Sequence, residues 1–168
     1  MALLSKSRRL SAAAASVTLA AASITLAASP ALAVTKLSQS QAAGQLSSAG
    51  VTSSSSGGCT DRYNSTCTSF EQINQSTVSG VITLHRASGC SVNITGGTET
   101  GHASGTYSHW NGYKVDISKY TCVGSYIKNN FAYAGYRGDG YPMWKAPSGN
   151  VYTDEGSHWD ILYYSCGC

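Results

Sequence analysis

The chain has 168 residues, of which 11% are charged, and its formal net charge is +3. That excess comes from Lys6, Arg8 and Arg9, because the basic and acidic residues after them are equal in number. A nucleic-acid partner requires a clustered basic face, so this charge balance predicts no nucleic-acid binding. The length fits one domain with a modest hydrophobic core.

Residues 1–33 have the pattern of a secretory signal peptide. Positive charges come first, an apolar run extends from Leu10 to about Ala28, and the small-residue triplet Ala31-Leu32-Ala33 follows. A membrane anchor is the alternative, but the run is rich in Ala, Ser and Thr and ends at a cleavage-type triplet. We therefore expect a secreted protein, extracellular or cell-wall associated, with no membrane contact after cleavage.

All six cysteines lie after residue 33, and an even number in a small exported domain indicates disulfides, here up to three. The sequence does not select among the possible pairings, although Cys59 and Cys67 are favoured as a local pair. Zinc bound by cysteines is the competing interpretation, but the paired C-x-x-C spacing is missing.

Residues 34–58 divide into two parts. Residues 36–49 are rich in Leu, Ala and Gln, and Leu37, Ala42 or Ala43, and Leu46 could share one helical face that ends before Gly50. The Ser/Gly run over 53–58 predicts a flexible joint. The predicted helix could pack on the following domain or form an N-terminal appendage.

From Cys59 onward the composition is globular. Residues 78–86 are β-favouring or mixed, and their structure stays open. Five glycines in residues 96–112 predict a loop, and the helical spacing of apolar residues over 118–132 predicts an amphipathic helix. The other expected elements are a short helix over 69–75 and strands over 90–95, 113–117, 141–145, 150–153 and 158–164.

This order of elements predicts a small single α+β domain. We expect an antiparallel sheet with flanking helices, stabilised by disulfides. No internal repeat is visible, and we expect a monomer.

Two histidines stand close to carboxylates at informative spacing. His109 precedes Asp116 by seven residues, and His158 follows Glu155 by three. Zinc favours imidazole and carboxylate ligands, and a catalytic zinc keeps three protein ligands and one water. We predict that His109, Asp116 and His158 bind Zn²⁺, and that Glu155 is the general base for the water.

The same residues resemble the hedgehog/D-Ala-D-Ala metallopeptidase superfamily. Its signature is a histidine, a glycine three residues later and an aspartate seven later, followed downstream by Glu-x-x-His. His109, Gly112 and Asp116 match the first part, and Glu155 with His158 matches the second. The resemblance extends over residues 90–164 and implies a zinc peptidase-like domain over 59–168 that acts on peptidoglycan peptides.

One departure from the family bears on substrate choice. Family members that act on a free C-terminal carboxylate usually place an arginine in the turn after the Ile-Thr strand, where this chain has Thr98-Glu99-Thr100. An arginine would bind a terminal carboxylate through two hydrogen bonds, which these residues cannot do. An endopeptidase that cuts within a stem or cross-bridge peptide is therefore favoured over a carboxypeptidase.

Other residues keep two interpretations. His102 could stabilise the oxyanion or bind substrate as a catalytic residue, or it could hydrogen-bond its own loop. Trp110 and Trp159 follow proposed ligands and could line a cleft or pack beneath the metal. The alternative for the whole domain is a non-catalytic module with the same fold that binds cell-wall peptide or glycan.

Overall fold

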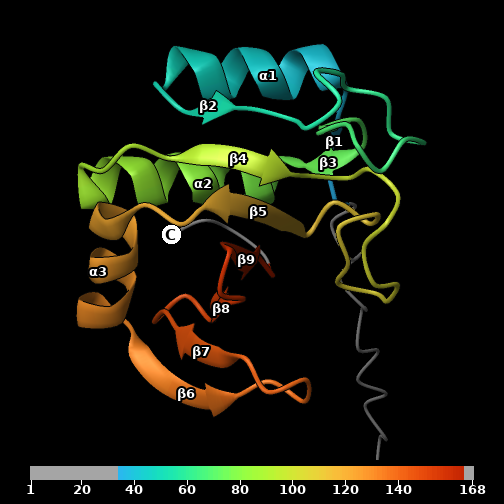
Figure 1. Ribbon diagram of the computed structural model, residues 1–168. Helices are drawn as coiled ribbons and strands as arrows, with labels where there is room; N and C mark the ends of the chain where they lie inside the picture. Colours follow the sequence, from blue (N-terminus) through green and yellow to red (C-terminus); the bar gives the residue numbers. More distant parts are fainter. Residues whose placement is uncertain (1–33, 165–168) are drawn as a thin grey trace, which may run out of the picture. The chain divides into compact units, whose positions relative to one another are not determined.

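The computed structural model describes residues 34–164, so the expected signal peptide, Cys166 and Cys168 lie outside the described residues. The described residues form an α+β domain with three helices, a seven-stranded sheet and a separate two-stranded sheet (Figure 1). The predicted α+β class and mostly antiparallel pairing are confirmed, and the sheet is larger than expected.

The large sheet has the strand order β2-β4-β5-β9-β8-β7-β6, and only β2 and β4 pair in parallel. The last strand in sequence, β9, therefore lies between β5 and β8. The small sheet pairs β1 with β3. The strands are β1 (Lys36–Leu37), β2 (Thr52–Ser53), β3 (Ile73–Asn74), β4 (Asn93–Gly96), β5 (Lys114–Ser118), β6 (Ala132–Tyr136), β7 (Pro142–Lys145), β8 (Val151–Asp154) and β9 (His158–Leu162).

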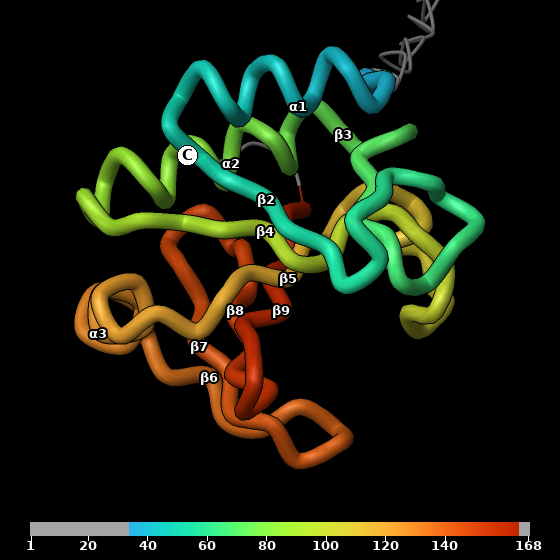
Figure 2. Tube along the Cα trace, turned by 45° about the horizontal axis from the view of Figure 1, so that its top comes forward, coloured from blue at the N-terminus to red at the C-terminus, as the bar shows by residue number. Residues whose placement is uncertain are grey.

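Residues 34–58 pack on the domain, which is one of the two alternatives left open by the sequence. Helix α1 (Gln39–Ser48) begins at a capping box between Ser38 and Gln41, and its Ala42 and Leu46 lie in the core. The views in Figures 1 and 2 agree that α1 lies beside α2 (Gln75–Ser88).

The Ser/Gly run is an ordered connection in the structure, not the flexible joint that its composition predicts. The backbone N–H of Ser54 donates to the Ile94 carbonyl at 2.9 Å, and that of Gly57 donates to the Thr66 carbonyl at 2.7 Å. The first bond continues the pairing of β2 with β4, and the second ties the run to the loop that follows it.

Helix α2 includes residues 78–86, whose secondary structure the sequence left open. Its Val78, Val81 and Leu84 are buried at helical spacing, so burial of this face outweighs the β-propensity of its branched residues. The short helix expected over 69–75 is wrong, because that stretch is a turn followed by β3. Helix α3 (Thr121–Asn130) lies within the predicted range, whereas β6 was not anticipated.

The central strands have one apolar and one polar face. Val115 and Ile117 of β5 and Trp159 and Ile161 of β9 are fully buried and belong to the hydrophobic core with residues of α2 and α3. The alternating residues of both strands face the other side of the sheet, since successive side chains on a strand point to opposite faces. Within residues 34–164, no helix has the length and apolar character needed to cross a membrane.

Two disulfides link the described residues. Cys59–Cys67 is the predicted local bridge, and Cys90–Cys122 joins the segment after α2 to the first turn of α3. The second pair, separated by 32 residues in sequence, was not selected by the sequence pattern.

Removing the Cys90–Cys122 bridge should destabilise the domain more than removing Cys59–Cys67. The loop-closure relation gives about 4 kcal/mol for the longer loop and about 2.5 kcal/mol for the shorter one. Paired Cys→Ala variants, compared by urea unfolding, measure the difference directly. Equal losses in the free energy of unfolding would show that chain entropy does not determine how much each bridge stabilises the domain.

Candidate metal and catalytic site

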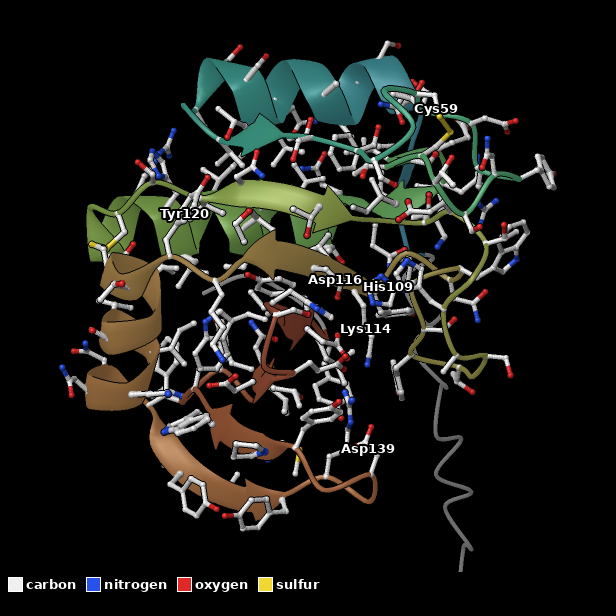
Figure 3. All side chains as sticks on the ribbon, in the orientation of Figure 1. Cys59, His109, Lys114, Asp116, Tyr120 and Asp139 are labelled. Atoms are coloured by element: carbon white, nitrogen blue, oxygen red, sulfur yellow. A yellow bond between two sulfur atoms is a disulfide. The ribbon has the colours of Figure 1, made fainter. Side chains whose placement is uncertain are left out.

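The site lies on the polar face of the sheet, where β5 and β9 pair. The register places Asp116 opposite Asp160 and Ser118 opposite His158. Lys114 shares this face because it lies two residues from Asp116. With the loop that precedes β5, these strands line a cavity of about 450 Å³. Figure 3 shows His109, Asp116 and Lys114 close together at one end of β5, with Asp139 on the β6–β7 hairpin.

His109 is buried and held in one orientation. Its Nδ1 donates to the Gly97 carbonyl at 2.8 Å, so Nε2 is the nitrogen that faces the site. Nε2 lies 3.4 Å from Asp116 Oδ1 and 3.6 Å from Asp160 Oδ1. Burial disfavours the charged imidazole, but the carboxylates of Asp116 and Asp160 outweigh it and raise the pKa of His109 to about 9. The position therefore favours positive charge.

Two glycines allow this geometry. Gly112 has a φ of 76°, and a Cβ there would lie 2.6 Å from the Gln72 carbonyl oxygen, so the turn between His109 and β5 requires glycine. A Cβ on Gly96 would lie 2.5 Å from Asp116 Oδ2. The glycine of the His-x-x-Gly pattern thus has a steric role.

The third predicted ligand, His158, approaches the same carboxylate. Its Nε2 lies 3.6 Å from Asp116 Oδ1 and 3.2 Å from Glu155 Oε2. Its Nδ1 is hydrogen-bonded to Ser157 Oγ at 2.9 Å. The structure therefore brings His109, Asp116, His158 and the predicted base Glu155 to one cavity.

His102 also belongs to the site. Its ring stacks on His109 with a centroid distance of 3.8 Å, and its Nδ1 lies 3.7 Å from Asp116 Oδ2. Its Nε2 lies 3.1 Å from Glu99 Oε1. His102 both lines the cavity and bonds its own loop, and ligand atoms of His102, His109 and Asp116 all lie within 4.8 Å of one another. His102 is thus an alternative third ligand.

Glu99 orients His102. It is 3% exposed, and its carboxylate accepts hydrogen bonds from the backbone N–H groups of Ser69 at 2.7 Å and Gly97 at 3.0 Å. Burial by itself raises the pKa of Glu99. The hydrogen bonds from His102 and these N–H groups have the larger effect and bring the pKa below its usual value, so the carboxylate is ionised. In the sequence, Glu99 was notable only as a residue unable to replace an arginine.

The residues fit a divalent cation. Ligand atoms of a tetrahedral zinc site lie about 3.3 Å apart, close to the distances from Asp116 Oδ1 to the Nε2 atoms of His109 and His158. Among residues 34–164, the set whose ligand atoms all lie within 4.8 Å of one another is His102, His109 and Asp116, without His158. Asp160 Oδ1 is buried and has no hydrogen-bond partner among residues 34–164. A buried carboxylate oxygen that accepts no hydrogen bond and lies 3.6 Å from the His109 imidazole is a suitable ligand for Zn²⁺.

Two cations hold the other oxygen of Asp160. Lys114 Nζ donates to Oδ2 at 2.6 Å and Arg137 Nη1 donates at 2.7 Å. Burial disfavours the charged form of Asp160, but His109 and Lys114 lower its pKa far below the usual range. Arg137 also forms an ion pair with Glu155. Alternation along β9 could have placed Asp160 here, whereas nothing in the sequence links Arg137 to the site.

The two tryptophans that follow predicted ligands have different roles. Trp159 is fully buried and packs beneath the site in the core. Trp110 is 38% exposed and stacks against the Arg62 guanidinium at 3.7 Å, so it lines the outer side of the loop.

Comparison of the chain with models of protein families, with curated proteins and with solved structures found no match. The geometry of the site and its spacing in the sequence therefore carry the functional argument.

Zinc binding should depend on His109 completely and on His158 more than on His102. We expect the mature protein to hold about one zinc after dialysis, and His109→Ala to hold none. His158→Ala should weaken zinc binding by more than about 100-fold, and His102→Ala by about 10-fold or less. Competition with a chromogenic chelator measures each affinity.

His85→Ala is the matched control, since His85 bonds the Cys90 carbonyl at 2.8 Å outside the cluster. If His102→Ala lost zinc while His158→Ala retained it, His102 would be the third ligand.

Proposed function

We propose that this protein is a secreted zinc-dependent peptidase that hydrolyses peptide bonds in peptidoglycan stem or cross-bridge peptides. The observation that carries the proposal is the convergence of His109, Asp116 and His158 in an open cavity, with Glu155 beside them. The spacing shared with the hedgehog/D-Ala-D-Ala metallopeptidase superfamily supports the substrate class.

Glu155 is suited to proton transfer. Zinc, when bound, supplies Lewis-acid chemistry by lowering the pKa of a water and polarising a carbonyl. Glu155 Oε2 lies within hydrogen-bond reach of His158 Nε2, so it is adjacent to any group that His158 binds. Its other oxygen is held by Arg137, which fixes the carboxylate plane. Glu155 Oε2 takes the proton of the water and returns it to the leaving amine.

His102 acts from the opposite side of Asp116. Its Nε2 is hydrogen-bonded to Glu99, and its Nδ1 lies 3.7 Å from Asp116 Oδ2 in the cavity. From this position the His102 ring can contact the substrate oxygen on which negative charge develops.

Internal cleavage fits this site better than removal of a terminal residue. The turn that holds an arginine in the carboxypeptidases instead contains Glu99, and its carboxylate faces His102 and backbone N–H groups. A second carboxylate from the substrate terminus would be repelled at this position.

Glu155→Gln should abolish hydrolysis while zinc is retained. A glutamine cannot accept the proton, so we expect the rate to fall by about 10³-fold. The measurement is release of new amino groups from purified peptidoglycan peptides, with products identified by mass spectrometry and zinc content measured on the same sample.

Asp61→Asn is the control, because Asp61 is an exposed carboxylate outside the cavity. It should change the rate by less than about 3-fold. A folded, zinc-loaded wild type with no hydrolysis of any wall peptide would favour a non-catalytic binding module, for which the Arg137–Glu155 ion pair would be structural.

A further inference from the structure

A second cavity continues from the metal site across the same face of the sheet. It has a volume of about 370 Å³ and lies over β9, β8 and β7. Lys114 and Arg137 line both cavities, so the two cavities adjoin at these residues and are together called the groove.

The two parts of the groove differ in charge. Four carboxylates line the first cavity, those of Asp116, Asp139, Glu155 and Asp160. The charged residues that line the second cavity are Lys114, Arg137 and Lys145, all of them cations. A ligand that extends from the first cavity into the second therefore passes from a lining of mixed charge to one in which every charged residue is a cation.

The strand register fixes where the lysines stand. Lys114 lies opposite Leu162, Leu162 opposite Val151, and Val151 opposite Lys145, so the four residues form one row across β5, β9, β8 and β7. At about 4.8 Å between strands, the row separates the two lysine backbones by about 14 Å. Apolar Leu162 and Val151 lie between them.

Lys145 is the cation with free hydrogen-bonding capacity. Arg137 is engaged by Asp139, Glu155 and Asp160, and Lys114 donates to Asp160. The Lys145 side chain forms no hydrogen bond or ion pair with any residue in the described part of the chain, and its backbone pairs within the sheet. Its ammonium group stands at the far end of the groove with three donors available.

We propose that Lys145 binds a carboxylate of the peptide substrate in this groove. Leu162 and Val151 contact the aliphatic part of the ligand between that carboxylate and the bond that is cut. The inference rests on the proposed peptidase function and names the class of its substrate: a peptide that carries a carboxylate at a set distance from the scissile bond.

The strand register also gives the distance between Lys145 and the site. Lys145 lies two strands away from Asp160 and two residues further along the strand direction, so their backbones are about 12 Å apart. An extended peptide spans about 3.3–3.6 Å per residue, so the carboxylate lies about three residues from the scissile bond. This places the negative charge well away from Glu99 and agrees with cleavage inside a peptide.

A binding experiment separates this inference from catalysis. The probe is a synthetic peptidoglycan stem pentapeptide with free carboxylates, compared with the same peptide in which every carboxylate is a carboxamide. The protein is the full mature chain carrying Glu155→Gln, which cannot turn the peptide over, and binding is measured by calorimetry at low salt.

We expect the acid form to bind about 5- to 10-fold more tightly than the amide. Lys145→Gln, added to the same chain, should reduce this ratio to about 1. Arg86→Gln is the charge-matched control, since Arg86 is exposed in the last turn of α2, and it should leave the ratio unchanged.

An acid-to-amide ratio that survives Lys145→Gln would overturn the proposal, as would failure of both peptides to bind. The result is independent of the proposed activity. A ratio that depends on Lys145 in a protein that cleaves no peptide would support the groove and contradict the peptidase. Efficient cleavage of both peptides by the wild type, with equal binding of the acid and amide forms, would support the peptidase and contradict the role of Lys145.

Discussion

Two carboxylates, Asp116 and Asp160, face each other across β5 and β9 and are both nearly buried. Like charges in directly opposed strand positions are destabilising, and burial adds the cost of desolvation. The surroundings compensate with cations: His109 lies between the two Oδ1 atoms, and Lys114 and Arg137 bind Asp160 Oδ2. Much of the polar architecture of this domain can be understood as a response to that pair of carboxylates.

The pair is held in place by the opposite face of the same strands. Ile117 lies opposite Trp159, and both are fully buried in the core. A slip of one residue in the β5–β9 register would expose these side chains and bury their polar neighbours, so hydrophobic burial enforces the register that creates the site. The core thereby positions the chemistry, even though no core side chain takes part in it.

Charge is separated along the polar face. Carboxylates gather where β5 meets β9, and cations dominate over β7 and β8. Under the proposed function, the end with carboxylates would hold the metal ion and the end with cations would bind the anionic part of a peptide. Arg137, from the β6–β7 hairpin, connects the two because it pairs with both Asp160 and Glu155.

The sequence by itself determined the local parts of this protein: the strand around Asp116, the strand from His158, the Cys59–Cys67 bridge, and the spacings that set His109 and Glu155 near their partners. These signals lie within a few residues of one another, so short-range geometry is enough to predict them. Tertiary structure alone decided that 78–86 is a helix, that β9 enters between β5 and β8, and that Arg137 and Lys145 reach the groove. Those outcomes depend on register and burial between segments far apart in the chain, which no local pattern encodes.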